Sequence, residues 1–310
     1  MVVKILTSLF VFITFGLCAT SISKPIHAQE GINVSPVVIE EEANPGDVLD
    51  LKIKILSGED TTLYTYPVDF KAGQEETGVP QFMPSDEEGG QYSLSKWIKL
   101  GSEPIDFKAG EKKEIPVRIE IPANAEPGGH YGAVIISIQD INARKTGMNI
   151  AGEVGTLILI RVSGAIKEEG SLVEFKTAKP WYEKMPASFV MRFQNSGNVH
   201  LKPFGNIEIF SLAGKKMATL QVNPNFGNVL PDSIRKFTNE WKVEKAGIIP
   251  LMGKFSAQLL ISYGAGQTAE ETVYFWIIPY KWLIAVFGGV VVLIGLVVVF
   301  GRKFKIVSKQ

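Results

Sequence analysis

The sequence has 310 residues, with three histidines and one cysteine, and 45% of its residues are hydrophobic. This composition suits packed cores and excludes a chain that is disordered throughout. Basic and acidic residues balance at 32 each, but seven of the basic residues and no acids lie in segments 1–28 and 281–310. Segment 29–280 therefore carries 25 basic and 32 acidic residues. This excess of acid argues against nucleic acid as a partner, because phosphate binding needs a basic face.

The first segment has the features of a signal peptide. Lys4 precedes an apolar run over 6–19, and Ala28 places a small residue just before Gln29. This order predicts a signal peptide over 1–28 and export of the chain. Lipidation at Cys18 is the alternative, although Leu17 stands where a lipoprotein signal needs a small residue. Cleavage after Ala28 removes the one cysteine, which excludes disulfides and thiol chemistry in the mature chain.

Segment 29–166 shows the period of two that is typical of strands. Leu49, Leu51, Ile53 and Ile55 alternate with charged residues after a turn at 44–47, and the same pattern recurs near residue 119. Several short strands separated by turn residues predict an immunoglobulin-like β-sandwich, here without the cysteine pair of antibody domains. We expect strands at 32–41, 49–55, 61–70, 95–100, 117–121, 131–139 and 154–163.

One stretch of this domain differs from the rest. The segment 72–93 is long, polar and acidic, and its glycines keep it loose. Loops of this length are uncommon in compact domains and are often functional. A solvated excursion with no partner is the alternative.

Segment 167–280 predicts a second sandwich. Phe189, Met191 and Phe193 share one face of a strand and Arg192 lies on the other. The turn residues 213–215 close a hairpin. The fold class is therefore an all-β ectodomain of two tandem immunoglobulin-like sandwiches, followed by one helix. Further strands are expected at 171–176, 186–194, 204–211, 216–222, 235–243, 253–263 and 270–277.

The C-terminal segment predicts a membrane anchor. Residues 282–301 carry no charge and, as a helix, are long enough to cross the hydrocarbon core of a bilayer. Tyr280 and Trp282 fall at one interface, and the basic tail 302–310 stays cytoplasmic by the positive-inside rule. We therefore expect a transmembrane helix over 281–301 in the plasma membrane, with a single pass and the ectodomain outside. A buried core helix is the alternative.

No residues predict catalysis, a metal or a cofactor. After signal cleavage only His130 and His200 remain, and they lie in different domains. The chain has no G-x-S-x-G motif and no phosphate-binding glycine loop. Exposed aromatic side chains commonly hold sugar polymers, which makes four tyrosines of the first domain the candidate ligand-binding residues, although each could also serve packing. They are Tyr64, Tyr66, Tyr92 and Tyr131.

The turn residues resemble those of a known family. The run 121–134, which reads IPANAEPGGHYGAV, and Trp97 are similar to the N-terminal peptidoglycan-binding domain of bacterial WxL-interacting proteins. In the second half, Asn195, Gly197 and Asn198, followed by the segment 229–233, are similar to the partner-binding domain of those proteins. The resemblance implies a surface protein that binds a cell-wall polymer such as peptidoglycan and bridges it to other envelope proteins.

Two other functions remain open. Periplasmic chaperones also have two immunoglobulin-like domains, and they capture a subunit by adding a strand and by gripping its terminal carboxylate with basic residues. Here the first strand ends in three glutamates at 40–42 and contains no Lys or Arg, and a permanent anchor suits a shuttle poorly. The third alternative is a surface hydrolase or an accessory subunit of one.

Overall fold

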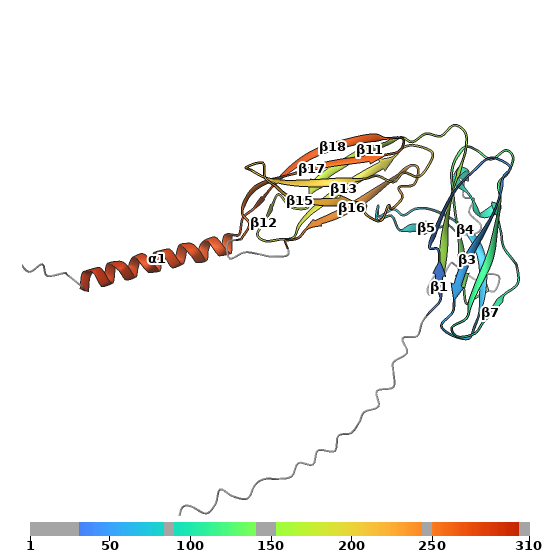
Figure 1. Ribbon diagram of the computed structural model, residues 1–310, viewed down its shortest axis with the longest axis horizontal. Coiled ribbons are helices and arrows are strands. Elements are labelled where there is room, and N and C mark those ends of the chain that lie inside the picture. The colour runs from blue at the N-terminus through green and yellow to red at the C-terminus, as the bar shows by residue number, and fades with distance from the viewer. Residues whose placement is uncertain (1–30, 84–89, 141–152, 244–249, 304–310) are drawn as a thin grey trace, which may run out of the picture.

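The computed structural model describes residues 31–83, 90–140, 153–243 and 250–303. The predicted signal peptide, 1–28, and the end of the predicted tail, 304–310, lie outside the described residues. Two β-sandwiches are followed by one long helix, which confirms the predicted fold class (Figure 1). The elements are β1 (Asn33–Ser35), β2 (Val38–Ala43), β3 (Val48–Leu56), β4 (Thr61–Ala72), β5 (Pro80–Phe82), η1 (Gly90–Tyr92), η2 (Ser95–Trp97), β6 (Ile98–Lys99), β7 (Ile105–Phe107), β8 (Lys112–Glu120), β9 (Gly128–Ser137), β10 (Val154–Val162), β11 (Gly170–Thr177), β12 (Trp181–Tyr182), β13 (Ala187–Asn195), β14 (Phe204–Ser211), β15 (Lys216–Val222), β16 (Ser233–Trp241), β17 (Gly253–Tyr263), β18 (Gln267–Ile277) and α1 (Tyr280–Lys303).

The first sandwich packs a sheet of order β1-β3-β8-β6 against a sheet of order β2-β10-β9-β4-β5, and β7 pairs with β4. The predicted alternation is confirmed on two strands. Ile53 and Ile55 of β3 and Val117 and Ile119 of β8 are buried, while the charged residues between them are exposed. Burial of each such side chain stabilises the fold by about 1.5–3 kcal/mol, so this inner layer holds the domain together.

The predicted strand 32–41 is two strands that belong to different sheets. β1 pairs antiparallel with β3, whereas β2 pairs parallel with β10. Pro36 stands between them and has no N–H to donate to a ladder, so the chain leaves one sheet there and joins the other. The crossing brings Glu40 of β2 to the side of the first sandwich that meets the second.

The sheet containing β4, β9 and β10 is apolar on both faces. Its inner face joins the core, and its outer face carries a second group of buried side chains, which we call the outer cluster. Leu230 of the second sandwich packs against this cluster, so part of the outer face serves as a contact between the domains. The outer cluster comprises Tyr66, Val68, Phe70, Tyr131, Ala133, Ile135 and Leu159.

The second sandwich packs a sheet of order β11-β13-β16 against a sheet of order β12-β18-β17-β14-β15. Phe189, Met191 and Phe193 of β13 are buried in its core, and Arg192 lies on the opposite face, as predicted. The connector between β10 and β11 contains the predicted division at 166. Figure 1 shows the two sandwiches meeting at an angle, with the junction far from the helix.

The chain ends in α1. Its segment Tyr280–Phe300 is long and apolar enough to cross a membrane, and none of it is buried against the sandwiches. The alternative of a buried core helix is therefore wrong. Two residues, Ile278 and Pro279, separate β18 from α1, so the second sandwich stands directly at the start of the helix. The orientation of the chain across the membrane stays a prediction.

Candidate interdomain binding site

Asn198 forms hydrogen bonds that link the two sandwiches. Its side-chain amide donates hydrogen bonds to the backbone oxygens of Pro127 (3.2 Å) and Ala165 (3.0 Å). Its own backbone oxygen accepts the N–H of Gly129 at 2.7 Å. Gly128 has φ +137°, and a Cβ at this position would lie 2.8 Å from that oxygen, so the contact requires glycine. The two turn sequences that carry the family resemblance thus touch each other across the junction.

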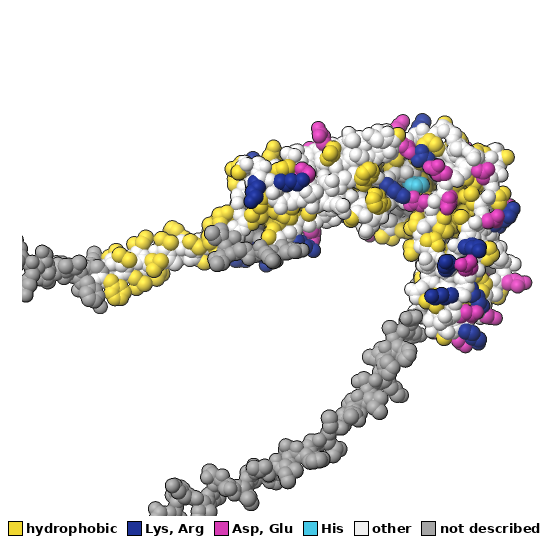
Figure 2. Space-filling view, viewed as in Figure 1, with side chains coloured by type: hydrophobic (Ala, Val, Ile, Leu, Met, Phe, Trp, Pro, Cys, Tyr) yellow, Lys and Arg dark blue, Asp and Glu magenta, His cyan; other side chains and the backbone are white. Residues whose placement is uncertain are grey.

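A charged network lies beside this contact. The Glu40 carboxylate accepts hydrogen bonds from the Lys202 ammonium and from the Asn228 amide (2.7 Å), and His200 Nε2 lies 3.9 Å from it. Burial raises the pKa of Glu40, but hydrogen bonds from Lys202 and Asn228 outweigh burial and hold the pKa below its usual range. Figure 2 shows a histidine at the junction with basic and acidic side chains around it.

His200 is mostly buried in this network and packs edge-on against the Tyr131 ring, with ring centroids 5.9 Å apart. Burial lowers the pKa of His200 to about 4, although the negative charge of Glu40 opposes the shift. The imidazole is therefore neutral at neutral pH. Its Nδ1 atom is buried and has no hydrogen-bond partner among the described residues, so a proton added there would find no acceptor among them.

The described part of the acidic segment 72–93 also bridges the domains. The Arg192 guanidinium donates two hydrogen bonds to the Glu76 carboxylate, at 2.7 and 2.5 Å, which lower the pKa of Glu76. The Glu76 backbone oxygen accepts the N–H of Lys236 at 2.7 Å. The alternative of a solvated excursion is therefore wrong for Glu76, while residues 84–89 of this segment lie outside the described residues.

These contacts frame a cavity of about 380 Å³, which we call the interdomain cleft. One wall is the outer face of the first sandwich, and the other is the loop that joins β15 to β16. The walls are largely apolar, with a few charged and amide side chains among them. Apolar lining residues are Val38, Phe70, Leu157, Leu159, Val79, Pro80, Phe226, Val229 and Leu230, and polar ones are Glu40, Lys202, Asn225, Asn228 and Arg235.

Arg235 is the most constrained polar group of the interdomain cleft. Its guanidinium lies between Gly78 and Gly227, where a Cβ on either glycine would approach it to 2.2 or 2.7 Å, and it sits over the Phe237 ring at 5.3 Å. Nη1 donates to the backbone oxygen of Asn228 at 2.7 Å. Two buried atoms at the cleft have no hydrogen-bond partner in the part of the chain that the structure describes: the donor Nε of Arg235 and the acceptor Oδ1 of Asn228.

The structure places the four predicted ligand-binding tyrosines on or beside the outer face. Tyr66 and Tyr131 are buried within the outer cluster, and Tyr92 packs against it. The Tyr92 hydroxyl donates to Asp232 of the second sandwich at 3.0 Å, and burial raises the pKa of both Tyr92 and Tyr131. Tyr64 is half-buried on the same strand as Tyr66. Tyr92 and Tyr131 thus contribute to the domain contact, and a ligand-binding role for the four stays a prediction.

A second cavity, of about 370 Å³, lies on the first sandwich alone, and we call it the Trp97 groove. Trp97 packs on the His130 ring at a centroid distance of 4.3 Å. The two His130 nitrogens face the backbone oxygens of Ser93 (3.1 Å) and Glu126 (3.0 Å), which fixes the ring. Other residues that line the groove are Gln91, Lys96, Pro122, Asn124 and Ala125, so the run that carries the resemblance builds one wall.

Sequence reasoning missed the interdomain cleft. Its two walls come from residues far apart in the chain, and the residues have no common motif. The sequence indicates turns and a family resemblance at 127–129 and 195–198, but it does not indicate that the two turns meet. Among the described residues, no group of three His, Cys, Asp or Glu side chains is placed to hold a metal ion.

No family model and no curated protein matches this chain, so the resemblance to WxL-interacting proteins stays a prediction. Solved structures with a similar arrangement of domains include the class 5 fimbriae chaperone CfaA, at 11% identity and a TM-score of 0.37, covering 80% of this chain and 100% of that one. The chaperone DraB of E. coli shares 11% identity, with a TM-score of 0.32 and coverage of 79% and 96%. The Pseudomonas aeruginosa chaperone CupB2 shares 11%, with a TM-score of 0.33 and coverage of 77% and 98%. At these values the likeness concerns the fold and supports no statement about function.

Proposed function

We propose that this chain is a non-catalytic, membrane-anchored envelope protein that binds an extended segment of another surface protein in its interdomain cleft. The observation that carries the proposal is the pairing, within one largely apolar cavity, of a buried donor on Arg235 with a buried acceptor on Asn228, neither of which has a hydrogen-bond partner among the described residues. Buried polar groups normally have partners, so this pair favours a ligand that supplies both kinds of bond.

A peptide backbone has the required chemistry. Each residue carries one C=O acceptor and one N–H donor, which suit Arg235 Nε and Asn228 Oδ1 respectively. The apolar walls suit alternate side chains of an extended segment. Glu40, Lys202 and Arg235 leave the cleft with one net positive charge, which favours a neutral or weakly acidic segment. A chain that binds such a segment could act as a bridge between surface proteins or as an assembly factor for them.

The test uses the full chain in detergent micelles and an array of overlapping synthetic 15-residue peptides from exported proteins of the same organism. We expect a subset of peptides to bind, and R235M to weaken this binding at least tenfold. The matched control is R118M, because Arg118 is an exposed arginine on β8, away from the interdomain cleft. Absence of binding above scrambled peptides, or equal binding by R235M and the parent chain, would contradict the proposal.

Cell-wall polymer is the second candidate ligand, and the Trp97 groove favours it. An aromatic ring beside amide, carboxylate and ammonium groups suits a sugar ring, whose faces are apolar and whose edges bear hydroxyls. Sedimentation of the full chain with purified insoluble peptidoglycan across a salt series tests this function. We expect N124A to reduce the sedimented fraction and R235M to leave it unchanged. No sedimentation at any salt concentration would exclude the polymer.

A further inference from the structure

The outer face of the sheet β12-β18-β17-β14-β15 changes character along its length. Near its middle it carries Glu208, Gln258, Glu270 and Thr272, which line an open polar depression. At the end near α1 it carries aromatic side chains that remain exposed, with Trp181 49%, Tyr274 62% and Trp276 48% accessible. Large exposed aromatics gathered on one patch of a domain mark an interaction site.

Strand pairing fixes these aromatic residues next to the start of α1. Trp181 of β12 lies opposite Trp276 of β18, and Trp276 also lies opposite Lys254 of β17. The Trp181 ring packs edge-on against Tyr280, the first residue of α1, with ring centroids 6.4 Å apart. The N–H of Ile278 bonds to the backbone oxygen of Tyr182 at 2.8 Å, which holds the chain entering the helix against β12.

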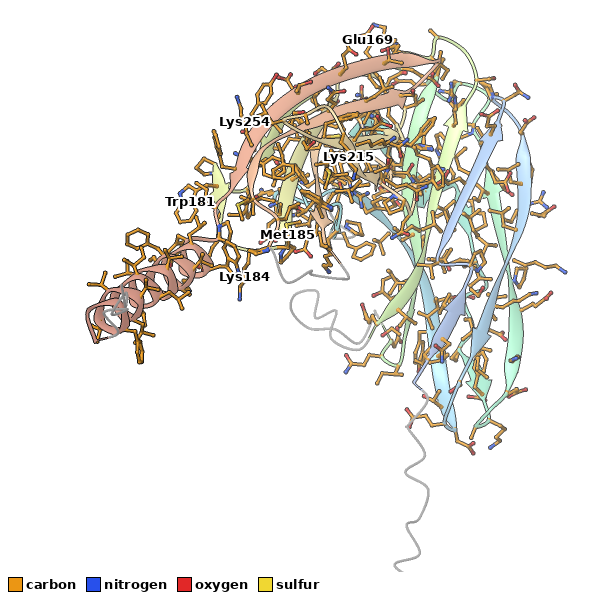
Figure 3. The ribbon with its side chains drawn as sticks, turned by 60° about the vertical axis from the view of Figure 1, so that its left-hand side comes forward. Glu169, Trp181, Lys184, Met185, Lys215 and Lys254 are labelled. Carbon is orange, nitrogen blue, oxygen red and sulfur yellow. The ribbon has the colours of Figure 1, made fainter. Side chains whose placement is uncertain are left out.

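Lysines surround this patch. The Lys254 ammonium lies 4.6 Å from the centre of the Tyr274 ring. Lys184 follows β12, and Lys215 lies in the turn between β14 and β15, whose strand ends are paired next to Lys254. None of these three lysines has a carboxylate partner among the described residues. Figure 3 shows Trp181 and Lys184 beside the point where α1 leaves the second sandwich.

We propose that this patch, formed by Trp181, Tyr274, Trp276, Lys184, Lys215 and Lys254, rests on the headgroup layer of the bilayer that α1 crosses. Tryptophan and tyrosine prefer the membrane–water interface, and lysines are attracted to anionic lipids. The patch is continuous with Tyr280 at the start of the span, and the acidic residues of the same face lie farther from the helix than the patch does. The end of the second sandwich next to α1 is therefore held at the bilayer by contact and not only by its tether. This inference depends on α1 spanning a membrane and is independent of the ligand of the interdomain cleft.

The test is tryptophan quenching by brominated lipid, with the full chain in nanodiscs. W282F removes the tryptophan of the helix and leaves Trp97, Trp181, Trp241 and Trp276. Because two of these four belong to the patch, we expect brominated lipid to reduce emission by up to about one half. The triple variant W181F/W276F/W282F should lose this effect, while W97F/W282F should keep it. Replacing Lys184, Lys215 and Lys254 by Gln should reduce quenching in anionic nanodiscs.

Both tryptophans of the patch are half-exposed, so we expect phenylalanine to be tolerated there, and far-ultraviolet circular dichroism with thermal unfolding checks the fold of each variant. The variant W181F/W276F retains Trp282 and reports on the anchor itself. The patch proposal alone would be overturned by two results together. Trp282 would be quenched, and the W282F protein would stay unquenched in both anionic and zwitterionic nanodiscs. An unquenched Trp282 would show instead that α1 does not span the bilayer. That result would overturn both the membrane anchor and the patch proposal.

Discussion

Acidification should weaken the protein through His200. Its pKa falls from 6.5 in the unfolded chain to about 4 in the folded one, because the junction buries the ring. Between these values the unfolded chain binds more protons than the folded chain, so the free energy of unfolding rises with pH. The neutral, buried His200 imposes no cost on the folded chain above pH 6.5. As the pH falls from 6.5 towards 4, the free energy of unfolding decreases. From pH 6.5 to pH 5, an interval of about 1.5 pH units, the free energy of unfolding falls by about 2 kcal/mol.

The assay is urea unfolding of the full chain in micelles at pH 7.5 and pH 5, followed by tryptophan fluorescence. The pKa of the Glu40 carboxyl is lowered in the folded chain, and both pH values lie above its ordinary value. We expect the parent chain to lose about 2 kcal/mol more than H200Q between the two pH values. The control H130Q keeps His200 and should keep the loss. Equal losses in the parent chain and H200Q would refute the burial argument.

Three further predictions concern the junction and the core. Gly128→Ala should destabilise the chain by about 1–3 kcal/mol, because φ +137° strains alanine and the Cβ overlaps the Asn198 oxygen; thermal unfolding measures this, and an unchanged melting temperature would count against it. Glu76→Ala removes the partner of Arg192, so it should broaden the distribution of distances between spin labels placed in the two domains. An unchanged width would mean that the ion pair does not hold the angle between the two sandwiches. Ile119→Ala, at a fully buried position, should cost about 2–5 kcal/mol in urea unfolding, and a smaller loss would show that the core relaxes around the cavity.

Much of the fold could be predicted because period-two alternation directly reports a strand with one buried face. It works for β3 and β8, and for β13 with Arg192 on the outside. It fails where both faces are covered. All ten residues of β9 are buried, so its sequence contains no alternation from which the outer face could be recognised, and it does not distinguish packing from ligand binding for Tyr131.

The candidate site could not be predicted because its contacts join distant parts of the chain. Glu76 and Arg192 are 116 residues apart, and Glu40 and Asn228 are 188 apart. Each has an ordinary local explanation as an exposed polar residue. Only the angle between the sandwiches brings them together, and that angle depends on the turn at Gly128 meeting the turn at Asn198.

The junction between β18 and α1 has a mechanical consequence. Ile278 is hydrogen-bonded to Tyr182, Leu283 to Pro279, and Lys281 to Glu183, so no slack segment separates sheet from helix. Rotation of the helix about its own axis would therefore turn the second sandwich with it. The first sandwich projects sideways from the end of the second that lies away from α1 (Figure 1). It would therefore move along an arc around the helix axis. A load on the first sandwich would correspondingly reach α1 as torque as well as tension.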